Sequence, residues 1–120
     1  MSMSKKTTSL LNLESEADFQ ARVIRAARLH GWSVYAIPDS RRATLAGYPD
    51  LTMYRRLDRR IIFAELKREK GKTSPVQDEV LADLRDIAQG GCCEVYVWRP
   101  SDWETILNTL KHKGIKESKD

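Results

Sequence analysis

Cysteine, histidine and long apolar runs are all scarce in this 120-residue chain. The two cysteines, Cys92 and Cys93, are adjacent, which fits neither a disulfide scaffold nor the spaced ligands of a zinc site, so we expect two buried thiols in a strand. The two histidines, His30 and His112, fall at the ends of expected helices, which disfavours an active site built on paired histidines. The apolar runs are far shorter than the ~18 residues that cross a bilayer. No apolar stretch follows the first lysines, so we expect a cytoplasmic protein with no membrane contact.

The composition predicts one folded domain with a charged surface. Hydrophobic residues make up 41% of the chain and charged residues 32%, a balance typical of a globular protein. Lysine and arginine number 21 against 17 acidic residues, and this net charge of +4 favours a polyanionic partner. We expect a flexible lead at residues 1–12, a domain at 13–110 and a flexible basic tail at 111–120.

Apolar periodicity and capping residues predict the order αβββαβα, an α/β domain with a mixed central sheet flanked by helices. The first helix covers residues 13–30, with Asn12 or Ser15 as its N-cap. Ser74 and Gln77 form a capping box that opens the second helix. Strands are expected at 32–37, 50–56, 60–67 and 92–98, and a last helix at 101–110.

Two of these strands, 50–56 and 60–67, are expected to form a hairpin, because their connection is too short for a crossover helix. A symmetric turn of even length pairs position 54 with 61 and position 52 with 63, and therefore places Asp50 opposite Glu65. Alternation along the strand puts Lys67 on the same face as Glu65. Opposed carboxylates with Cβ atoms ~5 Å apart repel each other unless a cation lies between them.

This pair of carboxylates predicts a divalent metal site. Asp50, Glu65 and the backbone carbonyl of Leu66 form a suitable shell for Mg²⁺ together with a substrate phosphate. In phosphodiester hydrolysis the metal polarises the phosphoryl oxygen, and Lys67 orients the attacking water or neutralises the developing charge. A plainer alternative is a solvated strand face for Glu65 and Lys67 and turn material for Asp50. Their conjunction at matching register favours chemistry.

The motifs resemble those of the PD-(D/E)XK nucleases and, within them, the VRR-NUC (virus-type replication-repair nuclease) group. The resemblance covers about residues 14–108. It is carried by four segments, at 16–20, 47–50, 62–67 and 72–77. The loop before Gly47 contains less glycine than the family often shows.

This resemblance implies a role for each matched residue. Asp50 and Glu65 would be ligands of Mg²⁺ or Mn²⁺, and Lys67 would be the catalytic lysine. Glu16 would be an additional acidic residue that reaches the metal through water, and Gln77 would orient the site or touch the substrate. On the residues alone, Glu16 is equally explained as a charge at a helix N-terminus, and Gln77 as a member of the capping box.

Basic residues are expected to hold phosphates on both sides of the motif, with Arg41 and Arg42 before it and Arg68, Lys70 and Lys72 after it. A second cluster lies at the tip of the hairpin, where it is either solvated turn charge or a contact for further DNA or a partner subunit. Its members are Arg55, Arg56, Arg59 and Arg60.

The resemblance implies a metal-dependent, structure-selective DNA endonuclease that acts in branched DNA such as four-way junctions. Small stand-alone members resemble phage-borne homodimers, which implies a homodimer in the host cytoplasm. Tyr96, Trp98 and Trp103 are candidates for its interface or, alternatively, members of the core. Two other functions stay open: a non-catalytic nucleic-acid-binding or assembly protein on the same fold, and a nuclease acting on RNA or on simple duplex ends.

Overall fold

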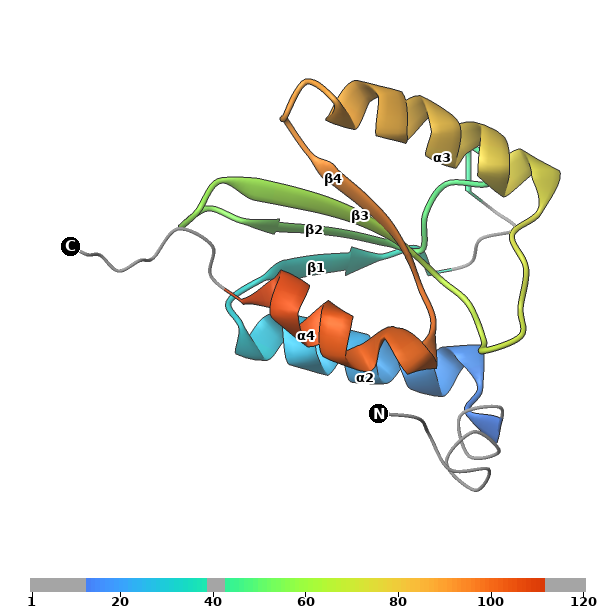
Figure 1. Ribbon diagram of the computed structural model, residues 1–120, viewed down its shortest axis with the longest axis horizontal. Helices are drawn as coiled ribbons and strands as arrows, with labels where there is room; N and C mark the ends of the chain where they lie inside the picture. Colours follow the sequence, from blue (N-terminus) through green and yellow to red (C-terminus); the bar gives the residue numbers. More distant parts are fainter. Residues whose placement is uncertain (1–12, 39–42, 112–120) are drawn as a thin grey trace.

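A computed structural model describes residues 13–38 and 43–111. The expected lead at residues 1–12 and most of the expected tail, residues 112–120, lie outside the described residues. The described elements follow one another as helix, three strands, helix, strand and helix (Figure 1). They are α2 (Glu16–Leu29), β1 (Ser33–Ala36), β2 (Leu51–Arg55), β3 (Arg60–Leu66), α3 (Pro75–Ala88), β4 (Glu94–Trp98), the short 3-10 helix η2 (Pro100–Asp102) and α4 (Trp103–Leu110).

The strands form one mixed sheet in the order β1-β2-β3-β4. Neighbours among β1, β2 and β3 are antiparallel, whereas β4 runs parallel to β3 because α3 carries the chain back between them. α2 and α4 lie on one face of the sheet, and α3 lies on the other (Figure 1). The predicted α/β class with a mixed sheet flanked by helices is therefore confirmed. Within the described ranges, no helix combines the length and the apolar character needed to cross a membrane.

The helix ends follow from local capping. Ser15 caps α2, and its Oγ accepts a hydrogen bond from the backbone N–H of Asp18 at 3.0 Å. α2 therefore begins at Glu16, later than the predicted start at residue 13. At the start of α3, Ser74 and Gln77 form the predicted capping box.

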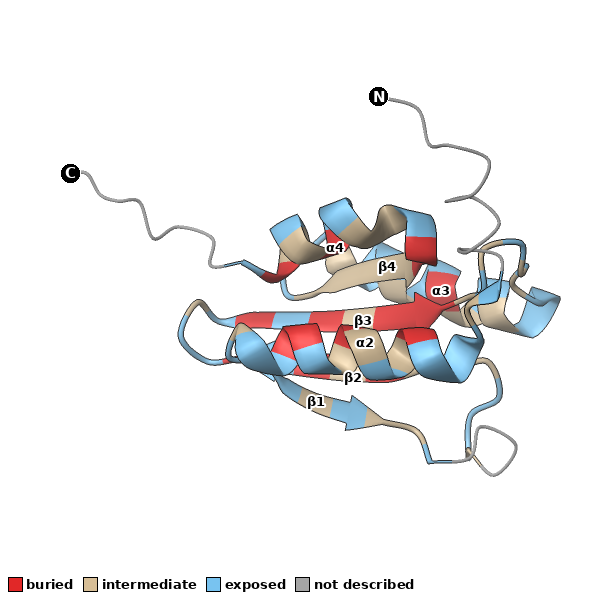
Figure 2. Ribbon diagram, turned by 90° about the horizontal axis from the view of Figure 1, so that it is seen from below, coloured by how far each residue is buried: buried red, intermediate tan, exposed pale blue. Residues whose placement is uncertain are grey.

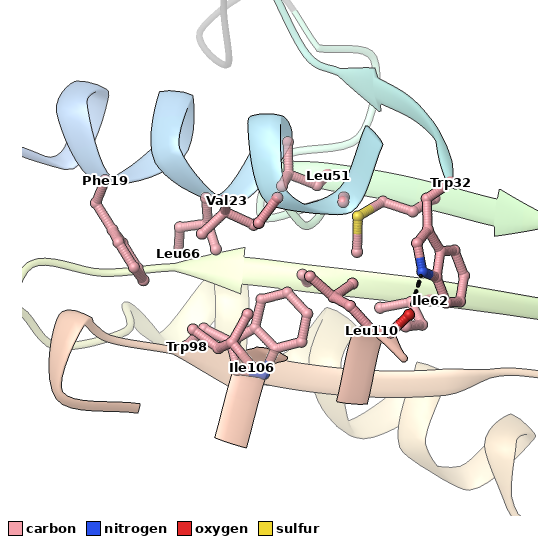
Figure 3. Close-up of a cluster of buried hydrophobic side chains, with 13 residues drawn as sticks. Phe19, Val23, Trp32, Leu51, Ile62, Leu66, Trp98, Ile106 and Leu110 are labelled. Atoms are coloured by element: carbon pink, nitrogen blue, oxygen red, sulfur yellow. Dashed lines mark hydrogen bonds between the residues drawn. The ribbon is translucent and has the colours of Figure 1, made fainter. Parts of the chain in front are cut away.

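The core is a layer of apolar side chains between the sheet and the helices α2 and α4 (Figure 2). β2 and β3 bury alternate residues toward this layer, as expected for strands with one packed face. Its fully buried members include Phe19, Val23, Leu51, Met53, Ile62, Leu66, Ile106 and Leu110 (Figure 3). Trp32 closes one end of the layer, where its indole N–H donates to the carbonyl of Leu110 at 2.9 Å.

Three aromatic residues near the C-terminus lie in this core or pack against it. Trp98 is buried, Tyr96 is stacked on it, and Trp103 is half-buried against the core. The core alternative is thus confirmed for Trp98, while Tyr96 and Trp103 pack against the core with part of each residue still accessible.

The prediction of two buried strand thiols is wrong. Cys92 is exposed and Cys93 is half-buried, and both lie in the turn between α3 and β4. The cysteines lie outside the strand because β4 begins to pair with β3 only at Glu94.

The interpretation of the whole hairpin-tip cluster as solvated charge is wrong for two of its arginines. The side chains of Arg55 and Arg60 are 2% and 8% exposed, and both guanidinium groups stack on the ring of Trp32. Arg55 pairs with Asp58 at 2.7 Å and donates to the carbonyl of Leu110 at 2.7 Å. These contacts fasten the end of α4 to the hairpin.

We expect Arg55→Met to destabilise the protein by about 3–5 kcal/mol, because it removes a guanidinium that pairs with the nearly buried carboxylate of Asp58, which Arg60 also contacts, and that donates to buried backbone carbonyls. Urea denaturation followed by circular dichroism measures the change. Arg56→Met is the matched control, since Arg56 is exposed, and its effect should stay within about 0.5 kcal/mol. Equal effects in the two variants would show that the buried contacts contribute nothing.

Candidate active site

Two carboxylates meet where β2 begins and β3 ends. β2 and β3 have the predicted register, with Tyr54 opposite Ile61. Continued to the residue before β2, this register puts Asp50 opposite Glu65. The Oδ2 atom of Asp50 also accepts a hydrogen bond from the backbone N–H of Leu66, at 2.8 Å. The carboxylate of Asp50 is thus fixed against the end of β3.

Glu65 is 1% exposed, although it lies on the sheet face away from α2 and α4. Its Oε2 atom accepts a hydrogen bond from Nε2 of Gln77 at 2.9 Å, and Nζ of Lys67 lies 3.4 Å from the same oxygen. Its Oε1 atom is buried and has no hydrogen-bond partner among the described residues. One carboxylate oxygen is therefore held in place while the other lacks a donor, an arrangement that suits a cation ligand.

A cavity of about 200 Å³ lies between these side chains, the start of α3 and the loop before β2. Four predicted site residues line it: Glu16, Asp50, Glu65 and Gln77. The loop reaches α3 through Gly47, whose φ is 85°. A Cβ atom there would lie 2.6 Å from the carbonyl oxygen of Val76, so glycine is required for this close approach.

The electrostatics of the pair are those of two carboxyl groups competing for one proton. Burial and, after it, the charge of Asp50 raise the pKa of Glu65 to about 7, although Lys67 acts in the opposite direction. Burial also raises the pKa of Asp50, against the hydrogen bond from Leu66 and the charge of Lys67. A divalent cation between the two carboxylates would relieve this repulsion.

The donor set fits one divalent cation with few protein ligands. Asp50 and Glu65 supply carboxylates, and the carbonyl of Leu66 points toward the side of Asp50, because the N–H and C=O of a strand residue share a direction. In the described part of the chain, no three His, Cys, Asp or Glu side chains come together as a ligand group. The remaining ligands would be waters and substrate oxygens, which is the pattern that Mg²⁺ favours.

Gln77 uses both ends of its amide. Its Oε1 atom accepts a hydrogen bond from the N–H of Ser74 at 2.9 Å, which completes the capping box, while its Nε2 atom donates to Glu65. The two alternatives for this residue are thus compatible, since the first turn of α3 is what carries the amide to the carboxylate.

The other predicted site residues differ in how close they lie to the carboxylate cavity. Glu16 lines the cavity from the first turn of α2, and its charge contributes to the raised pKa of Glu65. Arg68, Lys70 and Lys72 are exposed in the loop after β3, outside the lining of the cavity. Arg41 and Arg42 lie outside the described residues.

Two residues that sequence reasoning missed hold the basic loop after β3. The guanidinium of Arg99 donates to the carbonyl of Gly71 at 2.8 Å, and Glu69 accepts from the N–H of Ser101 at 2.9 Å. No motif marks these positions, because each contact spans about thirty residues of chain and depends on how β4 lies beside β3.

Comparison with family models, curated proteins and solved structures found no match to this chain.

Proposed function

We propose that this protein is a metal-dependent phosphodiesterase that cleaves DNA, a structure-selective endonuclease with a PD-(D/E)XK core of the VRR-NUC kind. The observation that carries the proposal is the pair of opposed carboxylates, buried Glu65 and half-buried Asp50, with the ammonium of Lys67 beside them. Two carboxylates that repel each other weaken both the fold and the attraction to phosphate. A hydrolase has a use for them as a cation site, whereas a protein that only binds DNA has none.

Mg²⁺ or Mn²⁺ bound at this site would polarise a phosphoryl oxygen and lower the pKa of a water molecule. Asp50, Glu65 and the carbonyl of Leu66 would hold it. Gln77 fixes Glu65 through Oε2, which leaves Oε1 available as a ligand. The ammonium of Lys67 is placed to hold the attacking water or to meet the charge that develops on the phosphate.

The basic residues of the loop after β3 support a nucleic-acid substrate. Arg68, Lys70 and Lys72 are exposed close to the carboxylate pair in the chain, and such residues give salt-dependent affinity for phosphates without reading base sequence. The resemblance of the motifs extends the proposal to branched DNA and to a homodimer whose two sites meet two strands.

The proposal is tested by incubating the purified protein with labelled single-stranded, duplex, flap and four-way-junction DNA, in Mg²⁺, Mn²⁺ or EDTA. We expect cleavage that requires a divalent ion and is lost in Asp50→Asn. Asp83→Asn is the matched control, because Asp83 is exposed in α3. Binding without cleavage under every metal condition would instead favour a non-catalytic nucleic-acid-binding protein, and cleavage confined to RNA or to duplex ends would change the substrate. Light scattering on the same samples measures the oligomeric state.

We expect Mg²⁺ or Mn²⁺ to raise the melting temperature of the wild type by several degrees, because the ion binds only the folded carboxylate pair. Asp50→Asn should show no such shift, while Asp83→Asn should shift as the wild type does. Differential scanning fluorimetry across a metal titration measures this. A shift of equal size in Asp50→Asn would place the ion elsewhere.

A further inference from the structure

A groove of about 850 Å³ lies on the open face of the sheet, beside the carboxylate cavity. α3 packs against β4, at one edge of this face, and leaves the β1 and β2 side uncovered (Figure 1). Tyr35 of β1 and Tyr54 of β2 both line the groove and are 60% and 57% exposed. They share one face because Tyr35 pairs with Thr52, which is two residues from Tyr54. Two large exposed rings on one sheet face indicate a binding surface.

The groove adjoins the carboxylate cavity. Ile37, Leu45 and Tyr48 line both. Tyr48 lies at the junction, where its hydroxyl is 3.4 Å from Oγ1 of Thr52 and its ring meets that of Phe63 edge-on, with 6.1 Å between centroids. A polymer that is cut at the carboxylates therefore has the tyrosines beside it on the same face of the protein.

The described residues that line the groove are uncharged, and basic side chains lie beyond its end. No acidic side chain is among the described residues that line the groove. At the far end of the β2–β3 hairpin, Arg56 and Arg59 are exposed in the turn. The extended chain from Asp50 to Arg56 measures about 20 Å. Phosphates can thus be held at the carboxylate site and at the hairpin turn, with the tyrosines of the groove between them.

We propose that this groove is a subsite for unpaired nucleotides, whose bases stack on Tyr35 and Tyr54. The proposal rests on the proposed nuclease function and deepens it, since it gives the substrate a single-stranded segment next to the bond that is cut. Base stacking on aromatic side chains tolerates any base sequence, and tyrosine offers a rigid ring with a hydroxyl that stays hydrated. A second copy of this chain is the competing occupant. It is less favoured, because a protein seated in the groove would also close the adjoining cavity.

The test compares binding of two labelled duplexes by fluorescence anisotropy in EDTA, one blunt and one with an unpaired tail of about four nucleotides. We expect the wild type to bind the tailed duplex at least about tenfold more tightly. The double variant Tyr35→Leu/Tyr54→Leu keeps apolar bulk without a π face and should lose this preference, whereas Tyr35→Phe/Tyr54→Phe should keep it. Leu29→Ala, which removes an exposed apolar side chain from α2, is the surface control.

Several results would overturn the subsite. These are equal binding of the two duplexes by the wild type, retention of the preference in the leucine variant, or a leucine variant that changes from dimer to monomer in light scattering with unchanged DNA affinity. Cleavage in Mg²⁺ at saturating tailed duplex is measured separately. Metal-dependent cleavage without a tail preference refutes the subsite and leaves the nuclease proposal standing. A tyrosine-dependent preference without cleavage under any metal refutes the nuclease proposal and leaves the groove as a binding surface.

Discussion

Lys67→Ala is expected to slow DNA cleavage by about 10²–10⁴-fold while leaving the protein folded and able to bind DNA. Nζ of Lys67 lies 3.4 Å from Oε2 of Glu65, at the edge of the carboxylate pair and outside the core. An ammonium in this position acts on charge that exists fully only in the transition state, so its removal lowers turnover more than affinity. Single-turnover cleavage at saturating Mg²⁺ and DNA isolates this effect from binding.

The control for this variant is Lys111→Ala, which removes the same charge at an exposed position at the end of α4. It should cleave as the wild type does, since Arg55 and Arg60 donate to the backbone carbonyl of Lys111, which the substitution keeps. Anisotropy in EDTA should give Lys67→Ala a DNA affinity within a few-fold of the wild type. If Lys67→Ala cleaved DNA as fast as the wild type, Lys67 would not be a catalytic residue.

Strand periodicity was sufficient to predict the centre of the site. The pairing of Tyr54 with Ile61 follows from the short turn between two strands, and this register alone brings Asp50 opposite Glu65. The capping box of Ser74 and Gln77 could also be read from the sequence, because it depends on residues three apart. Local rules therefore account for the parts of the site that are local in the chain.

The features that sequence reasoning missed depend on contacts between distant segments. Arg55 and Arg60 are the strand residues on either side of a charged turn, and nothing local indicates that Trp32 and the end of α4 bury them. For Gln77, local rules predict only the capping box, and its place near the site came from the resemblance, because the hydrogen bond that joins α3 to β3 is long-range. The sequence predicts only that Tyr35 and Tyr54 lie in strands, because their exposure depends on which sheet face the helices leave uncovered.

Glu65→Gln is expected to abolish cleavage and, in EDTA, to make the protein more stable than the wild type at pH 8 by about 2 kcal/mol. Burial raises the pKa of Glu65 to about 7 from its ordinary value of 4.5. Between these values the folded wild type keeps a proton that the unfolded chain has lost, so its stability falls as the pH rises toward 7 and stays reduced above it. A neutral amide of the same shape mimics the protonated carboxyl at every pH and avoids this loss.

Urea denaturation in EDTA from pH 5 to pH 8 measures the difference in stability, which should widen as the pH rises toward 7 and then level off. Glu79→Gln is the matched control, because Glu79 is exposed in α3, and its curve should run parallel to that of the wild type. With a divalent ion present, the wild type should become the more stable of the two proteins. The ion binds the wild-type carboxylate pair, whereas Glu65→Gln offers it only one of the two carboxylates. A gain in stability paired with a loss of activity is the signature of a carboxylate that is retained for its chemistry. If Glu65→Gln were less stable than the wild type at pH 8 in EDTA, the carboxylate of Glu65 would stabilise the fold even without metal. That result would contradict the assignment of Glu65 and Asp50 as a cation site.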